Sequence, residues 1–251
     1  MDARVLGKRY VATIVTSLFI LLNGSACIAG DGDTEQLLIG MVEQFEKVAD
    51  YTCRLDKRVK KNGILYEDLA ISVKYKKPQQ YYFRWEQGSA KGREVIFVAG
   101  KNNDRLVAHP GGLFQFVTLR LNPDGHLAMQ KNRHSLRHSG MEKIMSLIDS
   151  NYKRSQEIGL DAIQNVEEGR MDGKGLLSVE CTFPENHGFY AHRIVIGIDK
   201  ALNLLVRISI FDWSEALVEE YLFRDLKVNV GLTEIDFHPG NPEYRFYNAK
   251  Q

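Results

Sequence analysis

A basic, histidine-containing stretch between residues 126 and 138 is the part of the chain whose residue types come closest to those of a chemical site. His134 and His138 are four residues apart and would share a face if one helix contained both. A zinc site needs further ligands, and no cysteine or His-Glu-Xaa-Xaa-His pattern lies nearby. We therefore expect Arg133, His134 and Arg137 to form a solvated or hydrogen-bonded loop. The sharper alternative is a basic rim that meets anionic lipid headgroups.

Other sequence patterns give no support for catalysis. Ser135, Ser139 and Ser209 lack the Gly-Xaa-Ser-Xaa-Gly elbow of hydrolases. Gly-Lys-Gly at residues 173–175 lacks the third glycine and the following helix of a dinucleotide site. The adjacent acidic pairs Glu167-Glu168 and Glu219-Glu220 fit ordinary surface charge. The sequence thus predicts no cofactor, no metal and no covalent chemistry.

Three cysteines lie at positions 27, 53 and 181. If a leader ends after Ala29, it removes Cys27 and leaves one pair in a compartment where disulfides persist. We expect a Cys53–Cys181 disulfide, with two separate buried thiols as the alternative. Cleavage before Cys27 would instead leave an N-terminal cysteine able to carry a lipid anchor.

The N-terminal residues have the pattern of a secretory signal peptide. Three bases precede residues 11–22, which carry no charge, and small residues follow up to Ala29. The uncharged run is shorter than the roughly 20 apolar residues that span a bilayer. We expect residues 1–29 to be a cleaved leader and residues 30–251 to form one exported, periplasmic domain. An uncleaved membrane anchor is the alternative.

The whole chain has an ordinary globular composition. Of its 251 residues, 44% are hydrophobic and 26% are charged, which excludes disorder, collagen and coiled coil. The net charge of +1 gives no electrostatic reason to expect a nucleic-acid partner.

Hydrophobic periodicity then indicates the elements. Apolar residues recur every three or four positions from Leu37 to Val48, which predicts an amphipathic helix that Asp33 or Thr34 can cap. From Tyr51 the period changes to two, and Asn-Gly at residues 62–63 predicts a hairpin between strands 51–60 and 64–76.

Short strands separated by turn residues follow along most of the remaining chain, with a second helix at residues 138–158. The expected strands are residues 81–86, 93–99, 105–109, 113–121, 162–168, 176–183, 191–198, 205–211 and 216–226. The spacing predicts a mainly β fold, an antiparallel sheet of about ten or eleven strands with two main helices.

Several of these strands have one large apolar face, which the helices or the curvature of the sheet must cover. The opposite face carries charged residues such as Lys74, Lys76 and Arg84, and we expect it to face water. Either a filled core or a half-barrel with an apolar ligand cavity would satisfy this requirement. For the second case we expect a cavity wall of Tyr81, Phe83, Trp85, Phe114 and Phe116, and also Trp213.

Ordered motifs along the chain resemble one known superfamily. Residues 73–78 read Val-Lys-Tyr-Lys-Lys-Pro and precede the aromatic strand Tyr-Phe-Arg-Trp at residues 82–85. The chain closes with an Asn and a Leu within residues 223–232, before Phe-His-Pro at residues 237–239. This order is similar to that of the LolA-like superfamily of periplasmic lipoprotein carriers. Residues 94–100 and 128–134 resemble an uncharacterised bacterial family with that fold.

The resemblance implies a curved antiparallel half-barrel covered by a helical lid. It also implies a binding protein that holds a lipid or acylated protein and exchanges it with an inner- or outer-membrane delivery partner. Members of the superfamily also include sensors of envelope stress, so a regulatory module that binds a protein partner is the alternative. A lipid- or glycan-acting enzyme is a further one.

Overall fold

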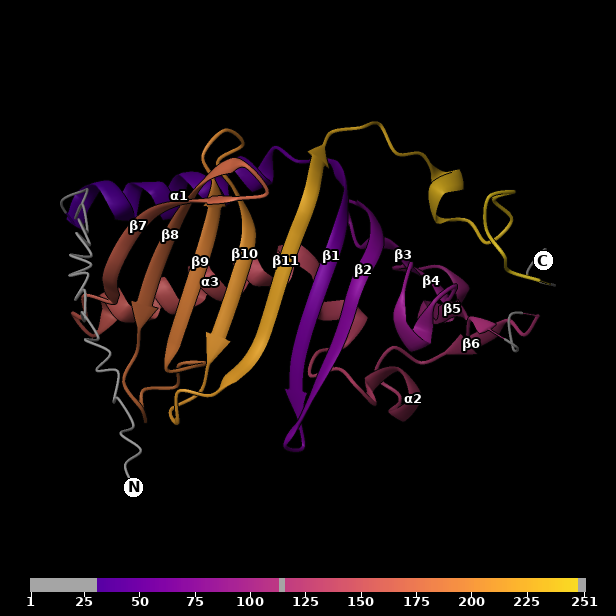
Figure 1. Cartoon of the computed structure of the whole chain (residues 1–251), viewed down its shortest axis with the longest axis horizontal. Helices are drawn as coiled ribbons and strands as arrows, with labels where there is room; N and C mark the ends of the chain where they lie inside the picture. Colours follow the sequence, from indigo (N-terminus) through magenta and orange to yellow (C-terminus); the bar gives the residue numbers. More distant parts are fainter. Residues whose placement is uncertain (1–30, 113–115, 248–251) are drawn as a thin grey trace, which may run out of the picture.

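The computed structural model describes residues 31–112 and 116–247 (Figure 1). The expected leader, Cys27 and Phe114 lie outside the described residues. Among the described residues, no helix is long and apolar enough to cross a membrane.

The described residues form one 11-stranded antiparallel sheet with helices on one face (Figure 1). Its strand order is β6-β5-β4-β3-β2-β1-β11-β10-β9-β8-β7, so β1 and β11 pair at the centre and join the two halves of the chain. The strands are β1 (Asp50–Lys61), β2 (Ile64–Lys76), β3 (Gln80–Trp85), β4 (Glu94–Val98), β5 (Leu106–His109), β6 (Leu119–Leu121), β7 (Ile163–Met171), β8 (Lys174–Thr182), β9 (Arg193–Asp199), β10 (Leu204–Phe211) and β11 (Leu217–Val228). The sheet is curved, and within the described residues β6 and β7 are its unpaired edges, which is the expected half-barrel architecture.

Helical segments supply the cover. They are α1 (Asp31–Glu46), α2 (His126–Met129), α3 (Gly140–Glu157) and the short 3-10 turns η1 (Gly88–Ala90), η2 (Asn102–Asp104), η4 (Leu136–His138) and η5 (Glu234–Phe237). The two long helices agree with the sequence prediction to within a few residues. The short α2 was not predicted, because four residues are too few to show a helical period.

The turn between β1 and β2 confirms the predicted hairpin. Asn62 and Gly63 both adopt positive φ angles, of 51° and 78°, as a tight two-residue turn requires. The register follows directly, because Lys61 pairs with Ile64 and the ladder continues to Asp50 and Lys76.

The two helices fill one half of the concave face. Leu38, Met41 and Phe45 of α1 and Ile148 of α3 belong to the buried core that lies on β8, β9 and β10. Val179, Ile194, Ile196 and Ile208 are the strand residues at its centre. Over β7–β10, therefore, the apolar face of the sheet is covered by a packed core.

The convex face is partly covered too, by the C-terminal segment of residues 229–247. Leu232, Phe237 and Phe246 pack on Tyr82 and Ile96 in a second apolar cluster. Lys74 pairs with Asp236 at 2.7 Å, and Lys76 donates to the carbonyl of Leu232. The expectation that this side faces water was therefore wrong over β2–β5.

The predicted Cys53–Cys181 disulfide is absent, and both cysteines are buried free thiols. Cys53 is on β1 and Cys181 is on β8, and four strand spacings separate these strands in the sheet. At about 4.8 Å per spacing the separation along the sheet is about 19 Å. A disulfide needs Cα atoms within about 7 Å, so this sheet order prevents the bond.

We expect the chain of residues 30–251, kept without reductant, to take up two iodoacetamide groups once it is unfolded and almost none while it is native. Burial raises the pKa of Cys181 to about 12 and that of Cys53 well above its usual range, so native thiolate is scarce. Intact-mass spectrometry measures the adducts, with a reduced sample as control. Unreduced protein that takes up no adduct after unfolding would contradict the free thiols.

Candidate functional site

A cavity of about 590 Å³ lies on the concave face over the half of the sheet formed by β1–β6. Its apolar wall includes Ile71, Val73, Phe83, Trp85, Leu106 and Ala108. The volume falls within the roughly 300–1,000 Å³ of small-molecule sites. Part of the apolar face of the sheet therefore lines a cavity, next to the packed core of the other half.

The cavity exists because the cover differs between the two halves of the sheet. α1 packs against β7 and β10 rather than against the strands from β1 to β6. Here the cover consists of the first turns of α3, through Ile144 and Leu147, and of residues 122–139, which contain α2 and η4. We call residues 122–139 the cover segment. It is mostly irregular chain, so it presents no continuous apolar helix face that could fill the space beneath it.

The cover segment is fastened to the sheet by polar contacts at the cavity wall. Lys57 of β1 donates to Asn132 Oδ1 at 2.8 Å and pairs with Asp68 at 3.2 Å. Lys61 donates to the carbonyl of Asn132 at 2.9 Å and to that of Met129. Charged side chains of β1 thus hold a backbone that has few hydrogen bonds of its own.

A second fastening point centres on Glu219 of β11. Its side chain is 1% exposed and accepts hydrogen bonds from Tyr190 and from Tyr221, the latter at 2.7 Å. From the cover segment, Arg133 lies 3.0 Å and His134 3.2 Å from the same Oε1 atom. A buried carboxylate of the sheet therefore holds the cover segment through these two residues.

Burial alone raises the pKa of Glu219, but the hydrogen bond and charge of His134 and the two tyrosine hydroxyls outweigh it. The net pKa of Glu219 lies below its ordinary value. Burial, and then the charge of Glu219, raises the pKa of Tyr190, which keeps this hydroxyl protonated as a donor. The cluster is thus arranged to stabilise one buried negative charge.

A family model described as a protein of unknown function, DUF1571, matches residues 48–246. The chain belongs to the DUF1571 family. The matched range starts two residues before β1 and ends after the last strand, so it includes the whole sheet and the cavity. A search of curated proteins finds no significant sequence match to this DUF1571 protein.

Several solved structures resemble the DUF1571 protein at low sequence identity. The lipoprotein LppX of Mycobacterium tuberculosis is 12% identical with a TM-score of 0.45, over 81% of this chain and 99% of LppX. LprF of Mycobacterium bovis is 12% identical with a TM-score of 0.44, over 80% and 95%. The Pseudomonas aeruginosa MucA/MucB complex contains a chain that is 13% identical with a TM-score of 0.42, over 82% and 60%. These values are too low to assign a ligand or partner to this DUF1571 protein.

The structure places only part of the expected aromatic wall at the cavity of the DUF1571 protein. Phe83 and Trp85 line it. Tyr81 is buried beside them. Its ring stacks on that of Phe83 with 5.9 Å between the centroids, and its hydroxyl donates to the carbonyl of Ser139. Tyr81 therefore supports the wall without lining the cavity.

Two other expected wall residues lie elsewhere. Phe116 is 61% exposed and contacts Tyr247. Of the predicted strand 113–121, the structure describes residues 116–121, and only residues 119–121 of these form a strand. Trp213 is 39% exposed in the turn between β10 and β11. For Phe116, period-two reasoning failed because it assumed strand geometry where the chain forms a turn.

Only two of the three residues of the expected basic rim line the cavity. Arg133 and His134 line the cavity, but both are bound to Glu219. Arg137 does not line the cavity; it pairs with Asp124 at 3.1 Å and with Asp104 at 3.6 Å, and lies over the ring of Phe97. The expectation that Glu219 and Glu220 are surface charge was wrong, since both are buried. Sequence reasoning also missed Tyr190 and Lys57, which are distant from Glu219 in sequence and carry no local motif.

The serines and glycines considered in the sequence analysis have structural partners or positions. Ser139 donates to the carbonyl of Ser135, and Ser209 donates to Glu220. Over the ranges 31–112 and 116–247, no group of three or more His, Cys, Asp or Glu residues could hold a metal ion. Gly173 and Gly175 belong to the β7–β8 hairpin.

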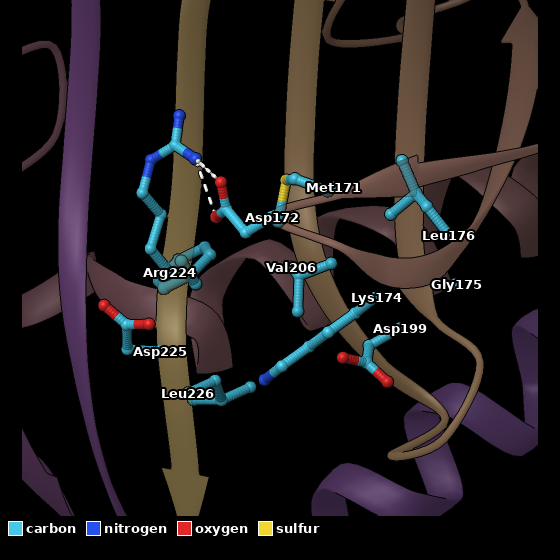
Figure 2. A pocket seen from close by; sticks show the side chains of 11 residues that line it. Met171, Asp172, Lys174, Gly175, Leu176, Asp199, Val206, Arg224, Asp225 and Leu226 are labelled. Atoms are coloured by element: carbon cyan, nitrogen blue, oxygen red, sulfur yellow. Dashed lines mark hydrogen bonds and ion pairs between the residues drawn. The ribbon is translucent and has the colours of Figure 1, made fainter.

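That hairpin closes a second, much smaller hollow of about 50 Å³ (Figure 2). Asp172 at the tip accepts two hydrogen bonds from Arg224 of β11, at 2.6 and 2.7 Å, which holds the tip against the sheet. Since one water occupies about 10–15 Å³ on this scale, only a few waters fit. The large cavity is therefore the better candidate for a ligand.

Proposed function

We propose that this protein binds a lipid or the acyl chain of an acylated protein and carries it without covalent chemistry. The observation that supports this proposal is the apolar cavity of about 590 Å³ on the concave face of the half-barrel. The LolA-like sequence motifs support it independently, since they imply a carrier of the same architecture.

The binding energy would come from burial. Each methylene group removed from water contributes about 0.8 kcal/mol. About ten buried methylenes would supply roughly 8 kcal/mol, which corresponds to a dissociation constant near the micromolar range. No bond has to form or break, and opening of the cover segment would set the rates of uptake and release.

We further propose that the protein acts outside the cytoplasm. The basic and then uncharged residues 1–22, followed by small residues, support a leader that ends after Ala29. Cleavage there would leave residues 30–251 in the periplasm, where a lipid has to cross an aqueous space. Retention through a lipidated Cys27 would place the same domain at a membrane surface.

The test is native mass spectrometry of residues 30–251 together with a titration of a fluorescent long-chain fatty-acid probe. We expect co-purified lipid, and at least a tenfold loss of probe affinity in Ala108→Trp, because the indole would occupy the cavity from its wall. Leu136→Trp fills it from the half-buried cover segment and guards against misfolding of the first variant.

Ala201→Trp is the matched control, since Ala201 is exposed in the β9–β10 turn. It should bind as the unmodified chain does. Lipid-free protein that binds no probe would reject carriage, and a partner protein bound through the sheet would then be the leading function. Binding that survives both cavity-filling variants would show that the ligand lies elsewhere.

A further inference from the structure

The charged residues that line the cavity are unequally paired. Its two carboxylates, Asp68 and Glu219, are both engaged, with Lys57 and with Arg133 and His134. Its remaining cations are Arg93, Lys131 and Lys143. In the part of the chain that the structure describes, none of these three lies within 4 Å of a carboxylate. The cavity therefore has an excess of positive charge that its own acidic groups do not neutralise.

Arg93 differs from the two lysines in its position. Lys131 and Lys143 are exposed, whereas Arg93 is half-buried directly before β4. Its guanidinium carbon lies 5.4 Å from the centroid of the Trp85 ring, and both side chains line the cavity. A cation held on an aromatic face and left without an anion is available for the anionic group of a ligand.

The backbone around Arg93 is tightly constrained. Gly111 packs so closely that a Cβ atom there would lie 2.1 Å from the carbonyl oxygen of Lys91 and 2.7 Å from the amide nitrogen of Arg93. Arg93 also accepts, through its carbonyl, the hydrogen bond of the Trp85 amide at 3.0 Å. Arg93 and Trp85 therefore lie in a tightly packed part of the sheet.

Within the described chain, the indole nitrogen of Trp85 is an unpaired donor beside Arg93. It is buried and has no hydrogen-bond partner among the described residues. Buried donors are nearly always paired, and an unpaired one costs about 1–3 kcal/mol. Among the described residues, the indole N–H therefore has no acceptor, and the Arg93 guanidinium over the same ring has no carboxylate partner.

We propose that the ligand is an amphiphile with an anionic headgroup, and that Arg93 and Trp85 bind this headgroup while the cavity takes the acyl chain. The proposal rests on the proposed function, since it presupposes an apolar ligand in this cavity. We place the headgroup at Arg93 rather than at Arg133, His134 or Arg137, because carboxylates of the protein already contact those three side chains. The shared chemistry is an oxyanion, either the carboxylate of a fatty acid or the phosphate of a lysophospholipid.

The experiment compares a fluorescent long-chain fatty acid with its uncharged methyl ester on residues 30–251. We expect the acid to bind about tenfold more tightly than the ester, which is the usual size of one charge-assisted hydrogen bond. Arg93→Gln should weaken binding of the acid about tenfold and leave the ester within about twofold. Arg93→Lys should retain part of the preference, because it keeps the charge but not the planar donor pair.

Arg170→Gln is the matched control, since Arg170 is exposed on β7 and does not line the cavity. It should change neither affinity. Competition by a lysophosphatidic acid and by an unlabelled fatty acid then distinguishes phosphate from carboxylate as the preferred headgroup.

The outcomes separate the two proposals. Equal binding of acid and ester, unchanged in Arg93→Gln, would overturn the headgroup site while leaving lipid binding intact. Parallel loss of both ligands in Arg93→Gln would mean that Arg93 only shapes the wall, and this too overturns the headgroup site. Failure of both ligands to bind the unmodified chain would instead reject the proposed function.

Discussion

Replacing Glu219 by alanine should lower the free energy of unfolding by about 3–5 kcal/mol, the usual loss when one partner of a buried charged cluster is removed. The variant would leave Tyr190, Tyr221, Arg133 and His134 without their common acceptor. Urea unfolding followed by intrinsic fluorescence measures the effect.

Glu168→Ala is the matched control for this change. Glu168 pairs with Lys200 at 2.6 Å, but both side chains are about half exposed, so the variant should lose less than about 1 kcal/mol. Hydrogen exchange should also accelerate across residues 122–139 in Glu219→Ala. If the two variants are equally stable, the Glu219 cluster does not hold the cover segment.

The same cluster predicts a dependence on pH. The folded pKa of Glu219 is lowered, so its stabilisation is present above the ordinary value near 4.5 and is lost as the pH falls through the lowered folded pKa. Glu219→Gln should therefore lose less stability between neutral and acid pH than the unmodified chain does. Some dependence will remain, because the pKa values of Asp56, Glu94, Glu220 and Asp236 are lowered as well.

Asp50→Ala is the second substitution with a large expected effect, and it acts on the opposite face of the sheet. The Asp50 carboxylate is buried and accepts hydrogen bonds from the amides of Val230, Gly231 and Leu232, at 2.7, 3.2 and 3.0 Å. Unpairing these amides should cost about 3 kcal/mol or more. Residues 229–247 should then detach and expose the cluster around Tyr82 and Ile96.

Hydrogen exchange and limited proteolysis at residues 229–247 measure the detachment. Asp50→Asn keeps one acceptor oxygen and should give an intermediate effect. Asp149→Ala, which removes an exposed pair with Lys153 within α3, should change stability by less than about 0.5 kcal/mol. Unaltered protection of residues 229–247 in Asp50→Ala would show that the apolar cluster alone retains the segment.

The sequence predicted most elements of the fold because they have local signals. Asn62 and Gly63 readily adopt the positive φ angles that a hairpin turn requires, and alternating apolar residues mark most of the strands. The apolar run from Leu37 to Val48 identified α1 in the same way. The strand prediction failed at residues 116–118, which precede β6 and form a turn and irregular chain.

The candidate site was only partly predictable. Phe83 and Trp85 were expected because their strand has a clear apolar face. Glu219 and Arg93 were not, since neither lies in a motif and each gains its role from residues far along the chain. Cys53 and Cys181 show the same limit in reverse, because a plausible pair by count is separated by three intervening strands.

The amino-acid sequence by itself therefore determined the strands, the two long helices and the apolar face that they cover, because turn chemistry and hydrophobic period act over a few residues. Only the tertiary structure decided where that face is packed and where it is hollow. The reason is that α1 and α3 together cover β7–β10, while the other half lies under the first turns of α3 and an irregular segment held by Lys57, Lys61 and Glu219. Which cations are neutralised and which is left for a ligand depends on the same long-range arrangement.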